Sequence, residues 1–228
     1  MPSPLLAFDT GSPLVSVAVA REGAVVAERS VEQHRSSALL LDLVQEALAE
    51  AGIGVQDLGG VTALRGPGSF TGLRIGLATA LGLHQALGVP ATALSTLQAL
   101  AASVDVESGI VVAAVDALRG EWSAQAFAAG GVPRPLGEME LVAGPELPRL
   151  AGGAPDAIVG FGVSRLAALP GWPAGIRLVE PGALAPAAAH LAAAAETEWN
   201  PQLLVAPIYS RPPAVSVPRQ RAAAVREA

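Results

Sequence analysis

One arrangement occurs twice in the sequence: an apolar strand that ends in an aspartate and is followed by a turn and a second strand. The first copy covers residues 5–20, with Asp9 at the end of the strand, and the second covers residues 110–127, with Asp116. The two aspartates are 107 positions apart, close to half of the 228 residues. This repeat predicts an internal duplication, in which each half is a small mixed sheet covered by helices.

Hydrophobic patterning and turn residues predict the remaining elements. Strands are expected over residues 5–8, 14–20, 24–29, 61–64, 91–94, 110–115, 122–127, 156–161 and 176–179. Helices are expected over residues 37–51, 72–87, 97–103 and 185–198, and a loop over residues 130–155, which are rich in proline and glycine. We therefore expect an N-terminal half (1–105), a C-terminal half (106–210) and a flexible basic tail (211–228).

The first two expected helices carry more apolar or small surface than one neighbour needs. Apolar residues of the helix over 37–51 cover about 200° of the helical wheel, about twice the usual stripe. In the next helix, Gly72, Gly76 and Ala80 share one face, and each interior glycine costs about 0.5–1 kcal/mol relative to alanine, which indicates close approach by another backbone. We therefore predict a helical docking surface for a partner. Its residues are Leu40, Leu41, Val44, Leu48, Gly72, Gly76, Leu77 and Ala80.

A glycine-rich loop, RGPGSFTG at residues 65–72, precedes the second helix. It does not match a Walker loop, which needs a lysine after its last glycine, because Leu73 stands there and all 14 basic residues are arginines. The dinucleotide fingerprint also fails, since Thr71 occupies the place of the third glycine. We interpret the loop as a packing device in which Ser69 or Thr71 is the N-cap of the helix.

Composition and charge narrow the classes of function. The chain has no cysteine, and no two of its three histidines are three or four positions apart, so no metal site is expected. The longest apolar stretch, residues 75–83, is about half a bilayer span, and no signal peptide is evident, so a cytoplasmic location is expected. Residues 211–228 hold four arginines and one glutamate, which leaves a net charge of −9 for residues 1–210. The tail could touch a phosphate backbone or serve only for solubility.

The segment FDTGS at residues 8–12 permits two kinds of chemistry. It matches the active-site peptide of aspartic proteases, but no second triplet is present. The same strand, Asp-Thr-Gly and hairpin form the first phosphate-binding element of actin-like ATPases and sugar kinases. Asp9, Thr10 and Asp116 would then line a vestigial nucleotide cleft, for which residues 158–162 supply a weak adenosine loop. Alternatively, both aspartates only cap their hairpins.

Five segments resemble the TsaB family, also called YeaZ, of bacterial tRNA threonylcarbamoyladenosine biosynthesis. They are LLAFDTGSPLVSVAV (5–19), RGPGSFTGLRIGLATALGL (65–83), ALSTLQALA (93–101), VDALRGEW (115–122) and APIYSR (206–211). The family's motif loop corresponds to Arg65, Gly66, Pro67, Gly68, Ser69, Phe70 and Thr71. The catalytic paralogue TsaD shares this loop but carries an H-x-x-x-H metal motif and a longer chain. Neither is present here, so the non-catalytic family is the match.

The resemblance implies a duplicated actin-like ATPase fold, of the ASKHA and RNase H-like type, without catalytic residues, metal or other cofactor. It further implies a scaffold that binds and activates a TsaD-like threonylcarbamoyltransferase, together with a TsaE-like ATPase. Contact with tRNA would occur only through that complex, and the isolated chain would form a homodimer. Two other functions stay open: a self-sufficient ATPase or kinase of the same fold, and a peptidase.

Overall fold

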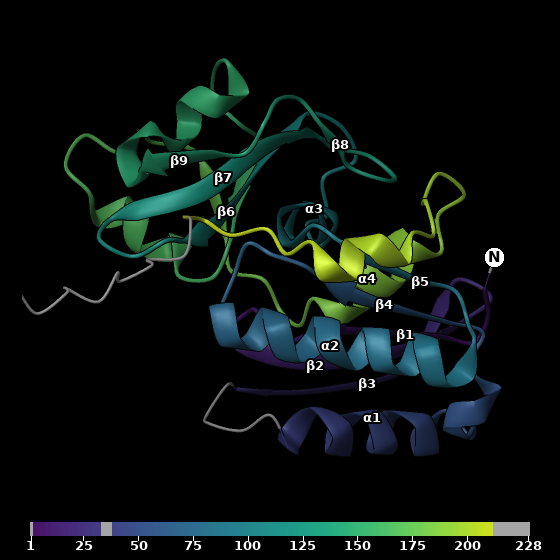
Figure 1. Cartoon of the computed structure of the whole chain (residues 1–228). Helices are drawn as coiled ribbons and strands as arrows, with labels where there is room; N and C mark the ends of the chain where they lie inside the picture. The colour runs from purple at the N-terminus through teal and green to yellow at the C-terminus, as the bar shows by residue number, and fades with distance from the viewer. Residues whose placement is uncertain (1, 33–37, 212–228) are drawn as a thin grey trace, which may run out of the picture.

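The computed structural model describes residues 2–32 and 38–211, which form two mixed sheets (Figure 1). The tail that the sequence predicts lies, apart from Arg211, outside these residues. The first sheet has the order β3-β2-β1-β4-β5, and the second has the order β11-β10-β6-β7-β8, with β9 also paired to β7. The strands of the first sheet are β1 (Leu5–Asp9), β2 (Leu14–Arg21), β3 (Ala24–Glu32), β4 (Gly60–Leu64) and β5 (Ala91–Leu94). Those of the second are β6 (Ile110–Asp116), β7 (Glu121–Ala128), β8 (Arg134–Pro135), β9 (Glu140–Ala143), β10 (Ala157–Val159) and β11 (Arg177–Val179).

The two sheets have the same topology. In each, the first strand lies at the centre, with an antiparallel hairpin partner on one side and parallel strands on the other: β2 and β4 flank β1, and β7 and β10 flank β6. Short turns connect the antiparallel pairs, whereas the parallel pairs need longer crossovers. This repeated topology confirms the predicted duplication. Asp9 and Asp116 end equivalent strands, β1 and β6.

Helices cover both faces of the first sheet. On one face lie α1 (Ala38–Glu50) and α2 (Phe70–Leu87), whose apolar residues pack with Leu6 and Phe8. Successive strand residues point to opposite faces, and Leu5 and Ala7 accordingly pack in a second core, with α3 (Thr96–Ala102) and α4 (Ala185–Ala192). Because this second core also contains residues of β6 and β7, it joins the two halves (Figure 1).

The described residues also form four short 3₁₀ helices: η1 (Val55–Asp57), η2 (Gly144–Ala151), η3 (Val163–Ala168) and η4 (Pro201–Val205). Three expectations need correction. The loop expected over residues 130–155 contains β8, β9 and η2, and the helix expected over 185–198 ends at Ala192. In addition, α4 and η4 belong in sequence to the C-terminal half but pack on the first sheet, where alanines of α4 allow close contact with β1 and β2. Within the described part of the chain, no helix combines the length and apolar character that a membrane crossing requires.

Candidate functional site

A cleft of about 500 Å³ lies between the two halves, at the ends of β1 and β6. We call it the inter-half cleft. The first half contributes the hairpin after Asp9 and the motif loop, and the second half contributes the turn after Asp116 and the start of η3. Its lining residues are Gly11, Ser12, Pro13, Pro67, Gly68, Ser69, Val115, Asp116, Leu118, Phe161, Gly162 and Arg165.

Asp9 is completely buried beside this cleft and binds the backbone of its own hairpin. Its Oδ1 accepts hydrogen bonds from the amides of Gly11 (2.8 Å) and Ser12 (3.3 Å). Its Oδ2 has no partner within the described residues. Burial raises the pKa of Asp9 to about 6, although hydrogen bonds from Ser12 and Gly11 oppose the rise. The hairpin amides that could face a phosphate are therefore engaged by this chain's own carboxylate.

The motif loop packs directly on the same hairpin. The Ser69 amide donates to the Gly11 carbonyl (2.7 Å), and a side chain at Gly68 would place a Cβ 2.6 Å from that oxygen. Ser69 Oγ accepts the Gly72 amide (3.3 Å), which confirms Ser69 as the N-cap of α2. Thr10 Oγ1 donates to the Gly72 carbonyl (2.7 Å). The loop is thus the packing device that the sequence predicts, and its glycines allow two backbones to approach closely.

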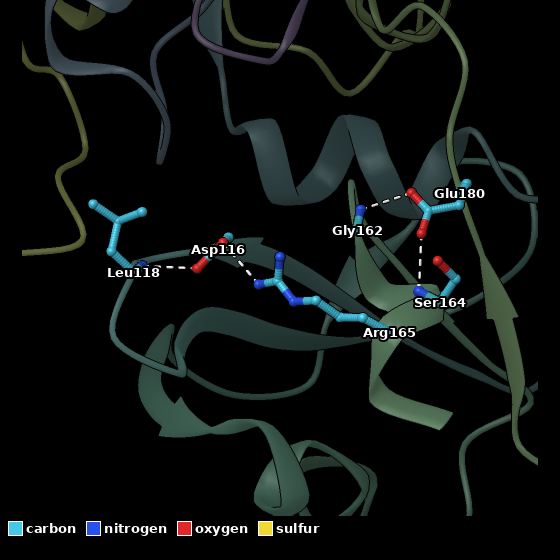
Figure 2. Close-up of polar contacts among 6 residues, drawn as sticks. All are labelled: Asp116, Leu118, Gly162, Ser164, Arg165 and Glu180. Atoms are coloured by element: carbon cyan, nitrogen blue, oxygen red, sulfur yellow. Dashed lines mark hydrogen bonds and ion pairs between the residues drawn. The ribbon is translucent and has the colours of Figure 1, made fainter. Parts of the chain in front are cut away.

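In the second half, Asp116 is held by two contacts (Figure 2). Its Oδ1 accepts the Leu118 amide (2.7 Å), and its Oδ2 forms an ion pair with Arg165 Nη2 (2.7 Å). The Arg165 guanidinium also lies 4.6 Å from the centre of the Trp122 ring. Asp116 therefore caps its turn, as Asp9 does, and faces an arginine of the same half.

Glu180 binds the loop that begins η3. Its two carboxylate oxygens accept the amides of Gly162 (2.7 Å) and Ser164 (2.9 Å), as Figure 2 shows. Partial burial works against ionisation of Glu180, but the Ser164 and Gly162 amides and the charge of Arg165 outweigh it and lower the pKa of the carboxyl. A second set of backbone donors is therefore also bound by a carboxylate of this chain.

The cleft offers little to a nucleotide phosphate. Three carboxylates, on Asp9, Asp116 and Glu180, already accept backbone amides around it, and its one lining cation, Arg165, is paired with Asp116. Among residues 2–32 and 38–211, no group of three His, Asp or Glu side chains could hold a metal ion. The vestigial nucleotide cleft, with Asp9, Thr10 and Asp116, stays a prediction. In the structure these three side chains form hydrogen bonds to the backbone of the turns and of the motif loop's helix.

The structure corrects the predicted docking surface. Seven of its eight residues are buried within this chain: Leu40, Val44, Leu48, Gly72, Gly76, Leu77 and Ala80. The apolar face of α1 packs on β2 and β3 of the first sheet. This sheet covers the face, so no partner protein is needed to bury it. A Cβ on Gly76 would collide with Thr10 Oγ1, so the glycine face of α2 packs on this chain's own hairpin. Leu41, which is 58% exposed, is the one predicted docking residue at the surface.

Sequence reasoning missed the residues that bind across long distances in the chain. Arg165, in η3, and Glu180, in a loop, are single charged residues with no spacing that distinguishes them. Tyr209 also has no distinguishing spacing, although its ring lies 5.0 Å from that of Phe70 and its hydroxyl accepts a hydrogen bond from Arg74 Nε (3.3 Å). The signal available for Tyr209 was its position in the segment APIYSR, which carries the family resemblance.

The duplicated mixed sheets, each with a hairpin and aspartate at the same place, define a protein of the actin-like ATPase fold. A family model described as TsaD, tRNA N6-adenosine threonylcarbamoyltransferase, matches residues 15–134. A solved structure of YeaZ from Pseudomonas aeruginosa superimposes with a TM-score of 0.69 and 29% identity, covering 82% of this chain and 89% of that one. A second, of an uncharacterized protein with similarity to peptidase YeaZ from the same organism, gives a TM-score of 0.70 and 31% identity over the same shares.

Curated relatives carry the same family name. The TsaB proteins of Escherichia coli and Bacillus subtilis are named tRNA threonylcarbamoyladenosine biosynthesis proteins and are 36% and 34% identical over 119 and 118 residues. Each match covers 51% of this chain and 52% of the relative, so the chain spans about half the length of the curated relatives it matches. The chain belongs to the TsaB (YeaZ) family.

Proposed function

We propose that this chain is the non-catalytic scaffold subunit of a bacterial complex that makes threonylcarbamoyladenosine in tRNA. In this role it binds and activates a TsaD-like threonylcarbamoyltransferase, and a TsaE-like ATPase joins the pair. Contact with tRNA occurs only through the complex, the isolated chain forms a homodimer, and the complex works in the cytoplasm. The family membership and the names of the curated relatives support the pathway.

One observation supports the non-catalytic role most directly: the chain's own carboxylates occupy the backbone donors around the inter-half cleft. Asp9 binds the first hairpin, and Glu180 binds the loop at Gly162. Binding of a nucleoside triphosphate would require these donors to exchange a neighbouring carboxylate for a phosphate, while Asp9 and Glu180 repel it. The chain also has no lysine to offset that repulsion.

The alternative is a self-sufficient ATPase or kinase of the same fold. The cleft of about 500 Å³ and the paired aspartates at equivalent strand ends favour it. Steady-state ATP hydrolysis by the isolated chain separates the two functions. The scaffold role predicts hydrolysis at the rate of a buffer control. Turnover near 1 per second, the low end of ordinary enzyme rates, that disappears in Asp9→Asn would establish the alternative instead.

Partner binding is the positive test of the proposal. We expect the purified chain to co-elute with the TsaD-like protein of the same organism. Leu41→Arg should weaken that association at least tenfold, because the substitution places a charge on the exposed side of α1. Leu136→Arg is the matched control, since Leu136 is 54% exposed but belongs to the second half. Arginine is a good helix former, so Leu41→Arg should leave α1 intact. Equal binding by the two variants would exclude this face of α1 from the interface.

A further inference from the structure

A second cavity of about 480 Å³ lies where the two halves meet, away from the residues that line the inter-half cleft. We call it the seam pocket. The first half contributes Arg65 at the end of β4 together with Leu97 and Gln98 of α3, and the second half contributes Gln125 and Phe127 of β7. Ile208, from the segment that follows η4, forms another wall. The pocket therefore has a mixed lining, in which Arg65, Ser95, Gln98, Gln125 and Glu138 are polar and the other five residues are apolar.

Arg65 is the polar group that needs an explanation. Its Nη1 donates to the Ala206 carbonyl (3.1 Å), but its Nε is buried without a hydrogen-bond partner. Arg65 forms no ion pair with any residue in the described ranges, and partial burial lowers the pKa of its guanidinium. A half-buried cation without a counter-ion loses hydration that its one hydrogen bond to the Ala206 carbonyl replaces only in part. An anion in the adjoining pocket would supply the missing counter-charge to the guanidinium.

The backbone holds Arg65 firmly in place. Its amide donates to the Leu94 carbonyl (2.9 Å), and its carbonyl accepts the Ile208 amide (2.7 Å). The next residue, Gly66, has a positive φ of 111°, and a side chain there would collide with the Ile208 carbonyl. The backbone on both sides of Arg65 is thus fixed, and the Nη1 bond to the Ala206 carbonyl restrains the side chain, so less conformational freedom is lost when a ligand binds.

Two glutamines supply hydrogen-bond acceptors at the same pocket. Gln98 Nε2 donates to the Pro133 carbonyl (3.1 Å), and Gln125 Nε2 donates to the Gly137 carbonyl (2.7 Å). Within the described residues, no hydrogen bond occupies the carbonyl oxygen of either side chain, so both oxygens can accept from a donor group of a ligand. The other charged residue that lines the pocket is Glu138, which is exposed at its rim.

We propose that the seam pocket binds a small organic monocarboxylate that also carries a hydrogen-bond donor. The carboxylate lies against the Arg65 guanidinium, the apolar body of the ligand packs on Leu97 and Phe127, and the donor group faces the glutamine oxygens. Arg65 is the one cation among the lining residues, and Glu138 adds a negative charge to the lining, so a ligand with one negative charge is repelled less than a phosphate dianion. This inference is independent of the scaffold role.

Ligand-observed NMR titration of the full chain tests the proposal, with hydroxyphenylpropionate as the probe. Its neutral amide, hydroxyphenylpropionamide, and inorganic phosphate are the comparison ligands. We expect a dissociation constant on the order of 1 mM for the carboxylate, as is usual for a ligand of this size, and at least tenfold weaker binding of the amide and of phosphate. Equal binding of the carboxylate and the amide, or tighter binding of phosphate, would overturn the proposal.

Variants locate the site. Arg65→Gln should abolish binding of the carboxylate, and Arg149→Gln is the matched control, because Arg149 lies in η2 and pairs with Glu140 outside the pocket. If Arg65→Gln does not fold, Gln98→Glu provides the same test, since a second carboxylate in the pocket should weaken binding at least tenfold. Unchanged binding by Gln98→Glu, or an equal loss in Arg149→Gln, contradicts the assignment.

Discussion

Replacing Asp9 by asparagine should change how the stability of the chain depends on pH. The structure removes the Asp9 carboxylate completely from water, and burial raises its pKa from 3.8 to about 6. A rise of this size corresponds to about 3 kcal/mol of preference for the protonated form in the folded state. Asparagine carries no charge, and its Oδ1 can still accept the Gly11 and Ser12 amides that Asp9 binds.

The direction follows from proton binding in the two states. Between about pH 4 and pH 6 the folded chain holds a proton on Asp9 that the unfolded chain has released, so the free energy of unfolding falls as the pH rises through this window. The stabilising contribution of the protonated group is fully present below pH 4 and lost above pH 6. The asparagine variant lacks this dependence. Relative to the parent, it should therefore gain about 3 kcal/mol between pH 3.5 and pH 7.5.

Urea unfolding followed by tryptophan fluorescence at a series of pH values measures this difference. Comparing variant with parent at each pH cancels the titration of the other carboxylates, and the cost of burying the asparagine Nδ2 does not depend on pH, so it shifts all points equally. Asp42→Asn, at an exposed position of α1, should show no comparable change with pH. A constant difference between Asp9→Asn and the parent would refute the reasoning, because it would mean that Asp9 is not a buried carboxylate with a raised pKa.

Two further predictions concern packing and surface charge, and both are measured by the same urea unfolding at pH 7. Gly76→Ala should destabilise the chain by about 1–3 kcal/mol, because the new methyl group collides with Thr10. Gly82→Ala in the same helix is the control: its methyl group meets open space and should stabilise the chain by up to about 1 kcal/mol. Equal effects of the two substitutions would contradict the packing of α2 on the hairpin. Arg165→Ala should lower the free energy of unfolding by no more than about 1 kcal/mol, because the side chains of Arg165 and Asp116 in the ion pair are 53% and 31% exposed. A larger decrease would contradict this prediction and show that the pair stabilises the cleft.

Local signals account for most of the fold. The strands around Asp9 and Asp116 and the end of α2 at Gly88 follow from residues near each other in the chain, because turns and caps depend on a few neighbouring side chains. Gly88 adopts the left-handed conformation at the helix end, and Ser69 is the N-cap. Among the elements that the sequence did not predict, β8, β9 and η2 are short and are held by pairing with β7 or by packing rather than by periodic patterning.

The docking residues show why the site was harder to predict than the fold. Hydrophobic patterning identifies the face of a helix that is buried, but it does not identify what buries it. Gly76 has the spacing of a helix–helix contact, yet its neighbour is Thr10, 66 positions earlier in the chain. The Asp116–Arg165 pair also depends on a distant contact, because it joins β6 to η3. Such contacts become visible only when the tertiary structure is known.

The scaffold role is tested most directly by reconstituting the transfer reaction. The TsaD-like subunit, the TsaE-like ATPase, a threonylcarbamoyl donor and unmodified tRNA are combined with or without this chain, and threonylcarbamoyladenosine is measured by mass spectrometry of the digested tRNA. We expect product formation to require this chain and to persist with Asp9→Asn, which removes the cleft carboxylate but leaves the fold intact. Full activity of the TsaD-like subunit without this chain, or loss of activity in a folded Asp9→Asn variant that still binds its partner, would contradict the scaffold role.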